Sequence, residues 1–358
     1  MKKQTEKPDI SLIIPCYNIE GHIDDCMQSV MCQKNIRKCE VILVNDGSVD
    51  STKKKLMKYV KRYPKIVQLV ENRYNLGVSA ARNIGLEKAK GNIMFVDGDD
   101  MIGGKLESGI DTYYLENFLD TLNSNPGASM VVGNLLVVDH DNTRMLCAKR
   151  FKNLFNHSTK KTIDINSALD LLDKRLSSCA ILYRADIIQK YNLRFMPQLT
   201  YFEDADFVIR YAFKGAPKYP SVLEVVPDFS HSYYIYRRRT DSAMTKLSCH
   251  SEKYMRRLER TQNKLAYYSR FLLRCNGLMG PDSHIYNIVA HRFSQTVKNI
   301  NVYKKDSDAV AYESLSRKYI PWQCVGCTKN RCIACGNNDI LLATAERCKN
   351  DLLHGRRR

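Results

Sequence analysis

Short apolar runs alternate with helical patterns through the first hundred residues of the chain. Buried strands are predicted at four apolar runs bounded by turn residues, namely 10–15, 39–45, 67–70 and 92–96. Helices are predicted between them, where apolar side chains recur at helical spacing, at residues 21–33, 51–63 and 78–90. Ser51 and Thr52 are expected to cap the second helix. This β-α-β-α-β-α-β order predicts a mostly parallel sheet with helices on both faces.

Three of these strands end in residues suited to binding a ligand. Pro15, Asp46 and Asp97 stand at or just beyond the ends of the first, second and fourth strands. In parallel α/β sheets, ligands bind beyond the carboxyl ends of the strands. We therefore expect the three strand ends to line one crevice.

The pattern changes character near residue 246. Before it, further strands are predicted at 129–138, 177–183 and 229–236, and further helices at 165–174 and 203–213. Beyond it, long stretches mix Tyr, Leu, Arg and Lys at helical spacing. The sequence thus predicts an α/β domain over residues 1–245 and a mainly helical C-terminal module over residues 246–358.

Charge is unevenly distributed along the 358 residues. The net charge is +18, and residues 246–358 alone hold 21 Lys and Arg against 9 Asp and Glu. Such a module could attract nucleic acid, anionic lipid or a phosphate-rich acceptor, or could be a solvated basic surface without a specific partner.

No export or membrane-spanning segment is predicted. No apolar run reaches the roughly 18 residues that a membrane helix needs, and no apolar segment follows the basic residues near the N-terminus. We expect a cytoplasmic protein, with peripheral contact to the anionic inner face of the membrane as an option. The thirteen cysteines are then expected to be reduced thiols, some of them buried.

An acidic cluster follows the fourth strand. Asp97, Asp99 and Asp100 crowd together there, and carboxylates so close repel one another unless a cation binds. Mg²⁺ and Mn²⁺ take oxygen ligands and are shared with substrate phosphates, and such a metal neutralises the charge on a leaving diphosphate. Gly98 permits the tight turn. The alternative is a surface turn rich in Asp and Gly.

Four segments together carry a resemblance to a known family. They are Ser11–Asn18, Glu40–Ser48, Asn75–Gly85 and Phe95–Asp100. In this order they resemble the inverting glycosyltransferases of family 2, which have the GT-A fold, a Rossmann-like sheet flanked by helices. The resemblance covers residues 9–102 closely and continues more weakly to about residue 245. Residues 246–358 resemble no family.

The resemblance implies a donor site with a metal. The nucleotide-sugar, most simply a UDP-sugar, would contact Pro15, Tyr17, Asn18, Asp46, Arg82 and Asp97. Asp46 would accept a hydrogen bond from uracil, and Asp97 would contact the ribose or support the metal. Asp99 or Asp100 would ligate Mn²⁺ or Mg²⁺, and the sequence leaves open which of the two does so.

A second carboxylate cluster, Glu203-Asp204-Ala205-Asp206, supplies candidates for the base. Inverting transfer needs one base to take the proton from the acceptor hydroxyl, and burial or a neighbouring like charge raises the pKa of a carboxylate toward that task. The resemblance implies that Asp204 is the base and that Glu203 positions the acceptor. The three acids could also simply begin a helix, whose dipole favours them there; both readings can hold together.

Three consecutive arginines follow the strand predicted at 229–236. In the family resembled, a strand with Tyr and Arg and a later Ser or Thr close over the diphosphate. Arginine suits phosphate because its planar fork donates two hydrogen bonds at once. Arg237 and Arg239 share one strand face by the period of two and are our candidates; a solvated edge is the alternative.

Two CxxC pairs lie close together in the C-terminal module. Cys324, Cys327, Cys332 and Cys335 have a spacing that could hold a structural Zn²⁺. The intervening loop is shorter than in ordinary zinc ribbons. Iron–sulfur ligation and plain thiols are the alternatives.

The sequence as a whole predicts a metal-dependent inverting glycosyltransferase that moves one hexosyl or N-acetylhexosaminyl unit to a hydroxyl of a cell-envelope or capsule-type glycan. The acceptor could be lipid-linked, with the basic module meeting the membrane. The Gln-x-x-Arg-Trp motif of processive synthases is absent, since the sole tryptophan, Trp322, follows Tyr-Ile-Pro.

Two alternatives remain. A sugar nucleotidyltransferase would need a Gly-rich loop with a lysine after the first strand, where this chain has Pro15-Cys16-Tyr17-Asn18. A nucleic-acid or polyanion-binding protein would use the basic module and its aromatic residues. Neither explains the ordered motifs at the strand ends, so nucleic acid is not expected as a partner.

Overall fold

The structure is a computed structural model. It describes residues 7–105, 109–138, 145–148, 162–164, 177–197, 203–215, 218, 221–224, 232–238 and 268. The chain divides into two units, one formed by residues 1–197 and 203–246 and the other by residues 198–202 and 247–358. All described residues except Tyr268 belong to the first unit, so the fold is described for that unit alone.

Eight strands of the first unit form one sheet. They are β1 (Ile10–Cys16), β2 (Cys39–Asp46), β3 (Val67–Asn72), β4 (Asn92–Phe95), β6 (Ala128–Val132), β9 (Thr162–Asp164), β10 (Ile181–Tyr183) and β11 (Ser221–Glu224). Their order in the sheet is β3-β2-β1-β4-β10-β6-β11-β9. The first four are parallel, and β10 runs antiparallel between β4 and β6. The predicted mostly parallel α/β sheet is therefore confirmed.

A second sheet was not predicted. It contains β5 (Met101–Gly104), β7 (Leu135–Val138), β8 (Met145–Ala148) and β12 (Tyr233–Arg237), in the order β5-β12-β7-β8. The single strand predicted at 129–138 is wrong in this respect, because it divides at Gly133 into β6 and β7, which belong to different sheets. A Cβ at Gly133 would lie 2.4 Å from the Phe118 ring, so the chain bends where only glycine fits.

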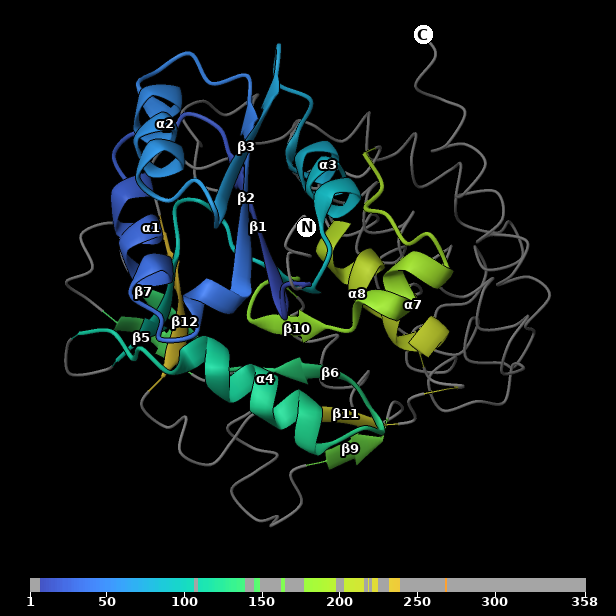
Figure 1. The fold of residues 1–358 in the computed structure, drawn as a ribbon. Helices are drawn as coiled ribbons and strands as arrows, with labels where there is room; N and C mark the ends of the chain where they lie inside the picture. The colour runs from blue at the N-terminus through green and yellow to red at the C-terminus, as the bar shows by residue number, and fades with distance from the viewer. Residues whose placement is uncertain are drawn as a thin grey trace, which may run out of the picture. The chain divides into compact units, whose positions relative to one another are not determined.

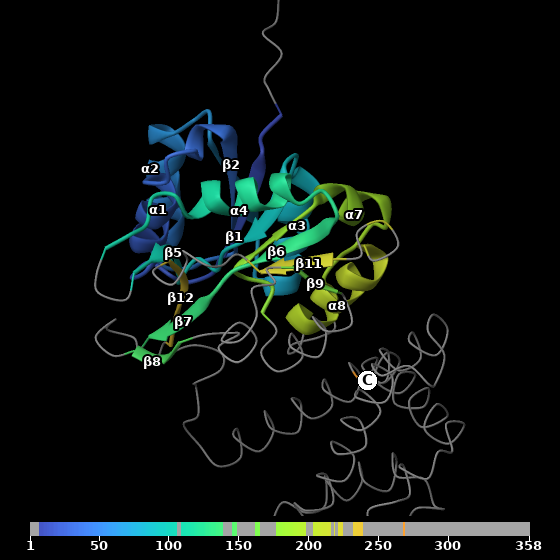
Figure 2. The ribbon, with the colours of Figure 1, turned by 90° about the horizontal axis from the view of Figure 1, so that it is seen from below.

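Helices cover both faces of the parallel strands. They are α1 (Ile23–Met31), η1 (Ile36–Lys38), α2 (Thr52–Arg62), α3 (Val78–Lys88), α4 (Tyr114–Ser124), α7 (Ala185–Lys190) and α8 (Glu203–Gly215). Figures 1 and 2 show α1 and α2 on one side of β1, β2 and β3 and α3 on the other. The predicted helices at 21–33, 51–63, 78–90 and 203–213 are confirmed, whereas α4 and α7 were missed. The helix predicted at 165–174 lies outside the described residues.

The expected cap of α2 is wrong in its detail. Ser51 stands at the N-cap but makes no capping hydrogen bond with its side chain. The Asp50 carboxylate accepts the Thr52 backbone N–H at 2.9 Å instead, and the Thr52 hydroxyl accepts the Ile19 N–H at 2.8 Å. The start of α2 is thereby tied to the loop after β1.

An aromatic cluster fixes α8 against the main sheet. Phe207 of α8 stacks on Phe195 with ring centroids 4.2 Å apart, and it meets the edges of Phe95 and Tyr183. Such pairs contribute about 0.5–1.5 kcal/mol each beyond the area they bury. Since Phe95 ends β4, the cluster holds the start of α8 near the residues that follow β4.

The sequence also led us to expect no membrane-spanning helix and reduced cysteines. Within the described ranges, no helix is both long and apolar enough to cross a membrane. Cys16, Cys26, Cys32 and Cys39 are reduced thiols, and all but Cys32 are buried.

Candidate active site

The ends of β1 and β2 are tied together by their loops. The two strands are neighbours, with Cys16 opposite Asn45. Asn18, at a left-handed φ of 50°, donates its backbone N–H to the Ser48 hydroxyl at 3.1 Å. Its side-chain oxygen accepts the Val49 N–H at 2.9 Å. The predicted donor-binding loop and the Asp-Gly-Ser turn thus form one structure, with Tyr17 exposed beside them.

Asp46 organises the loop after β3. Its carboxylate accepts hydrogen bonds from Asn72 Nδ2 at 2.6 Å, Leu76 N at 3.0 Å and Gly77 N at 2.8 Å. Next to it, Gly47 has a φ of +70°, and a Cβ there would lie 2.5 Å from the Tyr74 backbone. The second strand end therefore fixes the third loop, and the predicted contact of Asp46 with uracil stays a prediction.

Arg82 lies at the centre of a carboxylate network. It rises from α3, and its side chain is only 3% exposed. Its Nη2 donates to Asp97 Oδ1 at 2.8 Å, and its Nη1 donates to Asp204 Oδ1 at 2.8 Å and lies 3.4 Å from Glu203. Burial acts to lower the pKa of Arg82, but Asp204 and Asp97 outweigh it and hold that pKa well above its usual value.

The structure brings the two acidic clusters together through this arginine. Asp97 follows β4, and Asp204 lies in the first turn of α8, more than a hundred residues later. The resemblance implied that Arg82 lies near the nucleotide. Its described contacts are with carboxylates and with the ring of Phe195, and contact with the nucleotide stays a prediction. The side chain of Arg82 thus connects the predicted nucleotide-sugar site at Asp97 with the predicted acceptor site at Glu203 and Asp204.

The three acids at the start of α8 have different environments. Asp206 pairs with Arg210 one turn later, with a shortest N–O distance of 2.5 Å. Within the part of the chain that the structure describes, Asp204 Oδ1 accepts from both Arg82 and the Ser178 hydroxyl, the latter at 3.0 Å. Burial and the neighbouring Asp204 raise the pKa of Glu203 to about 8, against the opposing effect of Arg82. All three acids lie in the first turn, as the helix-dipole reading expected.

The acidic cluster after β4 is divided by burial. Asp97 and Asp99 are partly exposed, whereas Asp100 is 1% exposed. Asp100 Oδ2 accepts from the Tyr234 hydroxyl at 2.8 Å, and Oδ1 accepts from the Arg237 backbone N–H at 2.9 Å. Burial, Asp99 and Asp97 together raise the pKa of Asp100 well above its usual value.

The donor set fits a metal that is shared with substrate phosphates. Among the described residues, no group of three or more His, Cys, Asp or Glu side chains could hold a metal by itself. Mg²⁺ and Mn²⁺ often take only one or two carboxylates and complete their shell with phosphate oxygens and water. Asp99 has the exposure for this role, whereas both oxygens of Asp100 already accept hydrogen bonds.

Arg237 points to α1. Its side chain is 2% exposed, and its Nη1 donates to Asp25 at 2.9 Å and lies 3.4 Å from His22 Nδ1. Its Nε and Nη2 are buried and have no hydrogen-bond partner within the described ranges. The predicted diphosphate contact of Arg237 stays a prediction. Arg239, the zinc candidates Cys324, Cys327, Cys332 and Cys335, and the rest of the C-terminal module except Tyr268 lie outside the described residues.

Sequence reasoning missed two residues of this site. Ser178 contacts Asp204, and Tyr234 contacts both Asp97 and Asp100. A serine within Ser-Ser-Cys gives no signal, and Tyr234 was one of four aromatic residues in a strand. Only the fold distinguishes these two.

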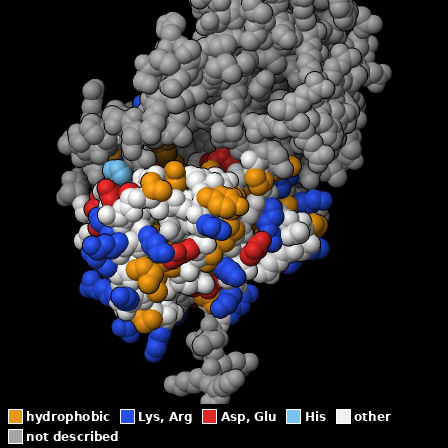
Figure 3. Space-filling view, turned by 90° about the horizontal axis from the view of Figure 1, so that it is seen from above, with side chains coloured by type: hydrophobic (Ala, Val, Ile, Leu, Met, Phe, Trp, Pro, Cys, Tyr) orange, Lys and Arg blue, Asp and Glu red, His pale blue; other side chains and the backbone are white. Residues whose placement is uncertain are grey.

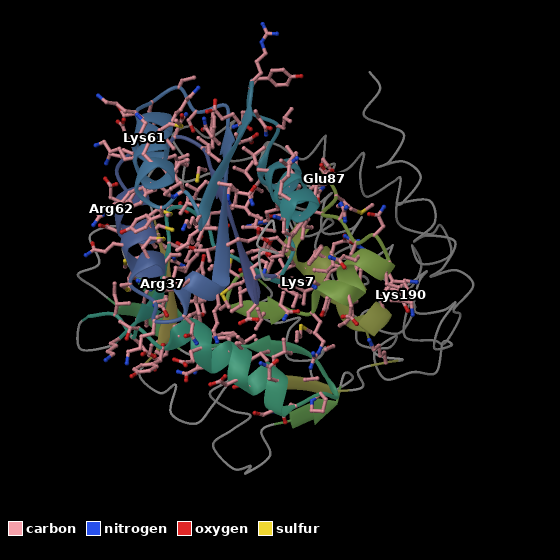
Figure 4. The ribbon with its side chains drawn as sticks, in the orientation of Figure 1. Lys7, Arg37, Lys61, Arg62, Glu87 and Lys190 are labelled. Atoms are coloured by element: carbon pink, nitrogen blue, oxygen red, sulfur yellow. The ribbon has the colours of Figure 1, made fainter. Side chains whose placement is uncertain are left out.

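Basic side chains of the first unit lie largely on its outer surface. Lys61 and Arg62 at the end of α2 and Lys190 at the end of α7 point away from the sheet (Figure 4). On the face in Figure 3, Lys and Arg are interspersed with Asp, Glu and hydrophobic side chains. These cations have the placement expected of helix C-termini.

Comparison with known proteins connects this geometry to a family. The profile of glycosyl transferase family 2 matches residues 11–191, about half of the chain. A teichoic acid poly(glycerol phosphate) polymerase of Staphylococcus epidermidis is 32% identical over 204 residues, which are 56% of this chain but only 26% of the polymerase. EpsJ of Bacillus subtilis, an uncharacterized glycosyltransferase, is 26% identical over 332 residues, 88% of each chain.

Solved structures share the fold. Residues 1–349 of S. aureus TarS in complex with UDP align with a TM-score of 0.53 at 16% identity, over 97% of this chain and 92% of that one. The mannosyltransferase PcManGT from Pyrobaculum calidifontis, in complex with GDP-Man and Mn²⁺, aligns with a TM-score of 0.50 at 14% identity, over 98% and 89%. The predicted GT-A fold of the first unit is confirmed.

Proposed function

The chain belongs to glycosyltransferase family 2, and on this premise we propose that it moves one sugar, with inversion, from a UDP-sugar to a hydroxyl of a cell-envelope or capsule-type glycan. The UDP complex of a protein with the same fold supports the donor class. The similarity to a teichoic acid polymerase supports the acceptor class and favours a phosphate-rich acceptor. Residues 1–245 would form the catalytic domain. The module over residues 246–358 would then serve the acceptor or the membrane.

The hydrogen bonding of Asp204 carries this proposal. Among the described residues, Arg82 and Ser178 both donate to Oδ1, which would fix the carboxylate and present Oδ2 to the acceptor proton. As the acceptor oxygen attacks the anomeric carbon, its proton passes to Oδ2, and the bond from that carbon to the diphosphate oxygen breaks. The products are the glycosylated acceptor and UDP.

Glu203 is suited to position the acceptor. With its pKa raised to about 8, its carboxyl group is largely protonated at neutral pH. It can then donate a hydrogen bond to an acceptor oxygen while Asp204 accepts the proton. In this proposal Glu203 is the hydrogen-bond donor to the acceptor and Asp204 is the base.

A divalent cation, Mn²⁺ or Mg²⁺, would neutralise the diphosphate as it leaves. Asp99 would hold it, and Asp97 would support it or contact the ribose. Mn²⁺ in the mannosyltransferase of the same fold supports this cofactor. The hydrogen bond from Arg82 to Asp97 would keep the Asp97 carboxylate in position for either role.

The test begins with the donor. Thermal-shift measurements with a panel of UDP-sugars, and with GDP-mannose as a contrast, each with and without Mn²⁺, would identify the donor that raises the melting temperature. Hydrolysis or transfer of that donor is then measured for Asp204→Asn. Because a general base contributes about 10²–10⁴-fold, we expect kcat to fall by about 10³-fold while UDP affinity stays within about twofold.

Asp206→Asn is the matched control. It makes the same substitution in the same helical turn, but at a carboxylate paired with Arg210. We expect it to retain activity within a few-fold. Full activity in Asp204→Asn, or equal losses in both variants, would contradict the assignment of the base.

A further inference from the structure

Tyr234 connects the two ends of the acidic cluster. It lies in β12 with no exposed surface. Its hydroxyl accepts the backbone N–H of Asp97 at 3.0 Å and donates to Asp100 Oδ2 at 2.8 Å. A tyrosine hydroxyl carries one proton and can also accept, and here it does both with residues of the same four-residue turn; the side chain of Tyr234 also makes a hydrogen bond with the Cys179 thiol.

The strand that carries Tyr234, β12, makes a second hydrogen bond to Asp100. The Arg237 backbone N–H donates to the other oxygen of Asp100. β12 also pairs antiparallel with β5, which starts at Met101 directly after Asp100. The carboxylate plane of Asp100 is therefore fixed at both oxygens by one strand, and the chain on its C-terminal side is fixed by the same strand.

From this geometry we propose that Tyr234 is a positioning residue that shapes the Asp97–Asp100 turn so that Asp99 faces the metal and the diphosphate. The proposal rests on the proposed metal-dependent transfer. In it, Asp100 acts as a buried support, and Tyr234 sets the backbone at Asp97 relative to that support. The geometry assigns different tasks to two adjacent carboxylates that the sequence could not separate.

The close packing of the turn leaves little room for compensation. A Cβ at Gly98 would lie 2.4 Å from Ile19 Cδ1 and 3.0 Å from the Pro15 carbonyl oxygen, so the turn lies directly against the end of β1. If the hydroxyl of Tyr234 is removed, Asp97 N–H and Asp100 Oδ2 both lose this partner. We expect the turn to change shape in order to satisfy them, and this change would move Asp99.

Tyr234→Phe tests the proposal, with Tyr211→Phe as the matched control. Tyr211 is also fully buried, and its hydroxyl also accepts a backbone N–H, from Arg184 at 2.8 Å, and donates to an oxygen, the Ser129 carbonyl at 2.6 Å. Both variants lose a backbone N–H partner and an oxygen partner in the core of the same unit, and each also loses a further contact, that of Tyr211 with the Arg184 carbonyl at 3.4 Å and that of Tyr234 with Cys179. Only one of those pairs belongs to the acidic turn.

The measurement is Mn²⁺ affinity by electron paramagnetic resonance, with and without UDP, in the full chain. Partners that orient metal ligands typically change metal affinity by about 10–100-fold. We expect Tyr234→Phe to weaken Mn²⁺ binding by about that factor and Tyr211→Phe by less than about twofold, while both lower the melting temperature of the metal-free protein similarly. Saturating Mn²⁺ should restore much of kcat in Tyr234→Phe.

Each result has a definite reading. Unchanged Mn²⁺ affinity in Tyr234→Phe, or equal weakening in both variants, overturns the role of Tyr234. A wild-type chain that binds no Mn²⁺ in the presence of UDP overturns the metal dependence in the proposed function, and this proposal falls with it. The wild-type titration therefore distinguishes the two failures.

A second pair of variants does not depend on the folding of Tyr234→Phe. Asp99→Asn should abolish detectable Mn²⁺ binding, whereas Asp100→Asn should retain binding that is weaker by no more than about tenfold. If Asp100→Asn loses Mn²⁺ as completely as Asp99→Asn does, Asp100 is itself a ligand and the role given to Tyr234 is wrong.

Discussion

Replacing Arg82 by methionine tests whether the candidate site is held together by charge. Methionine keeps an unbranched side chain in α3 but removes the guanidinium that contacts Asp97, Glu203 and Asp204. The variant leaves these carboxylates close together without their common cation. We expect loss of both stability and activity, since the same contacts fix the candidate base.

The magnitude follows from burial. Arg82 is 3% exposed, Asp97 27% and Asp204 21%. Removing one partner of a buried ion pair costs about 3–5 kcal/mol, because the remaining charge is left uncompensated. The carboxylates keep some contact with water, which screens them, so we place the cost near the lower end, at about 3 kcal/mol. That is a large part of the about 5–15 kcal/mol that stabilises a typical domain.

The assay is urea unfolding followed by circular dichroism at neutral pH. Arg210→Met is the control, because Arg210 pairs with one carboxylate, Asp206, on the same helix. Arg82→Lys should recover part of the loss, since it keeps the charge but cannot span Asp97 and Asp204 with two nitrogens. Adding Asp97→Asn and Asp204→Asn to Arg82→Met should recover stability by removing the repulsion. A loss below about 1 kcal/mol in Arg82→Met would refute charge compensation as the basis of this network.

Two further predictions concern pH and backbone conformation. The pKa of Glu203 is raised from 4.5 to about 8, so its contribution to stability is complete below about pH 4.5 and is lost as the pH rises through about 8. The free energy of unfolding in urea should therefore be lower at pH 8.5 than at pH 5, and Glu203→Gln should remove this part of the decline. An equal decline in the wild type and in Glu203→Gln would contradict the prediction. Gly47→Ala should destabilise the protein by about 1–3 kcal/mol, because a Cβ there would meet the Tyr74 backbone at 2.5 Å with a φ of +70°. Gly21→Ala, where a Cβ meets nothing within 4 Å, should melt close to the wild type.

The parallel half of the main sheet could be predicted from sequence because its signal is local. Each of β1 and β2 is a nearly continuous buried apolar run, as expected for strands covered on both faces. The strand ends then follow from chain order, which is why Asp46 and Asp97 could be placed at one edge. The second sheet had no such signal, because β12 pairs with β5 across more than a hundred residues.

The contacts within the site could not be predicted from the hydrophobic pattern of the sequence for a related reason. Arg82 has the same signature in the sequence whether it faces solvent, a nucleotide or carboxylates, and only the packing of α8 against β4 brings Asp204 to it. Asp99 and Asp100 likewise differ in how far they are buried, and the sequence motif alone does not show this difference. These assignments depend on tertiary neighbours that no local window contains.

Asp97 is the residue at which these neighbours meet. Its carboxylate is held by Arg82, which also holds the candidate base, and its backbone N–H is held by Tyr234, which also holds Asp100. A displacement of Asp97 would therefore be transmitted both to the acceptor side through Arg82 and to the metal-facing turn through Tyr234. If both links act as described, Arg82→Met and Tyr234→Phe should not be additive in their effects on Mn²⁺ affinity, because residues that share a partner couple. Additive losses in the double variant would mean that the two contacts hold Asp97 independently.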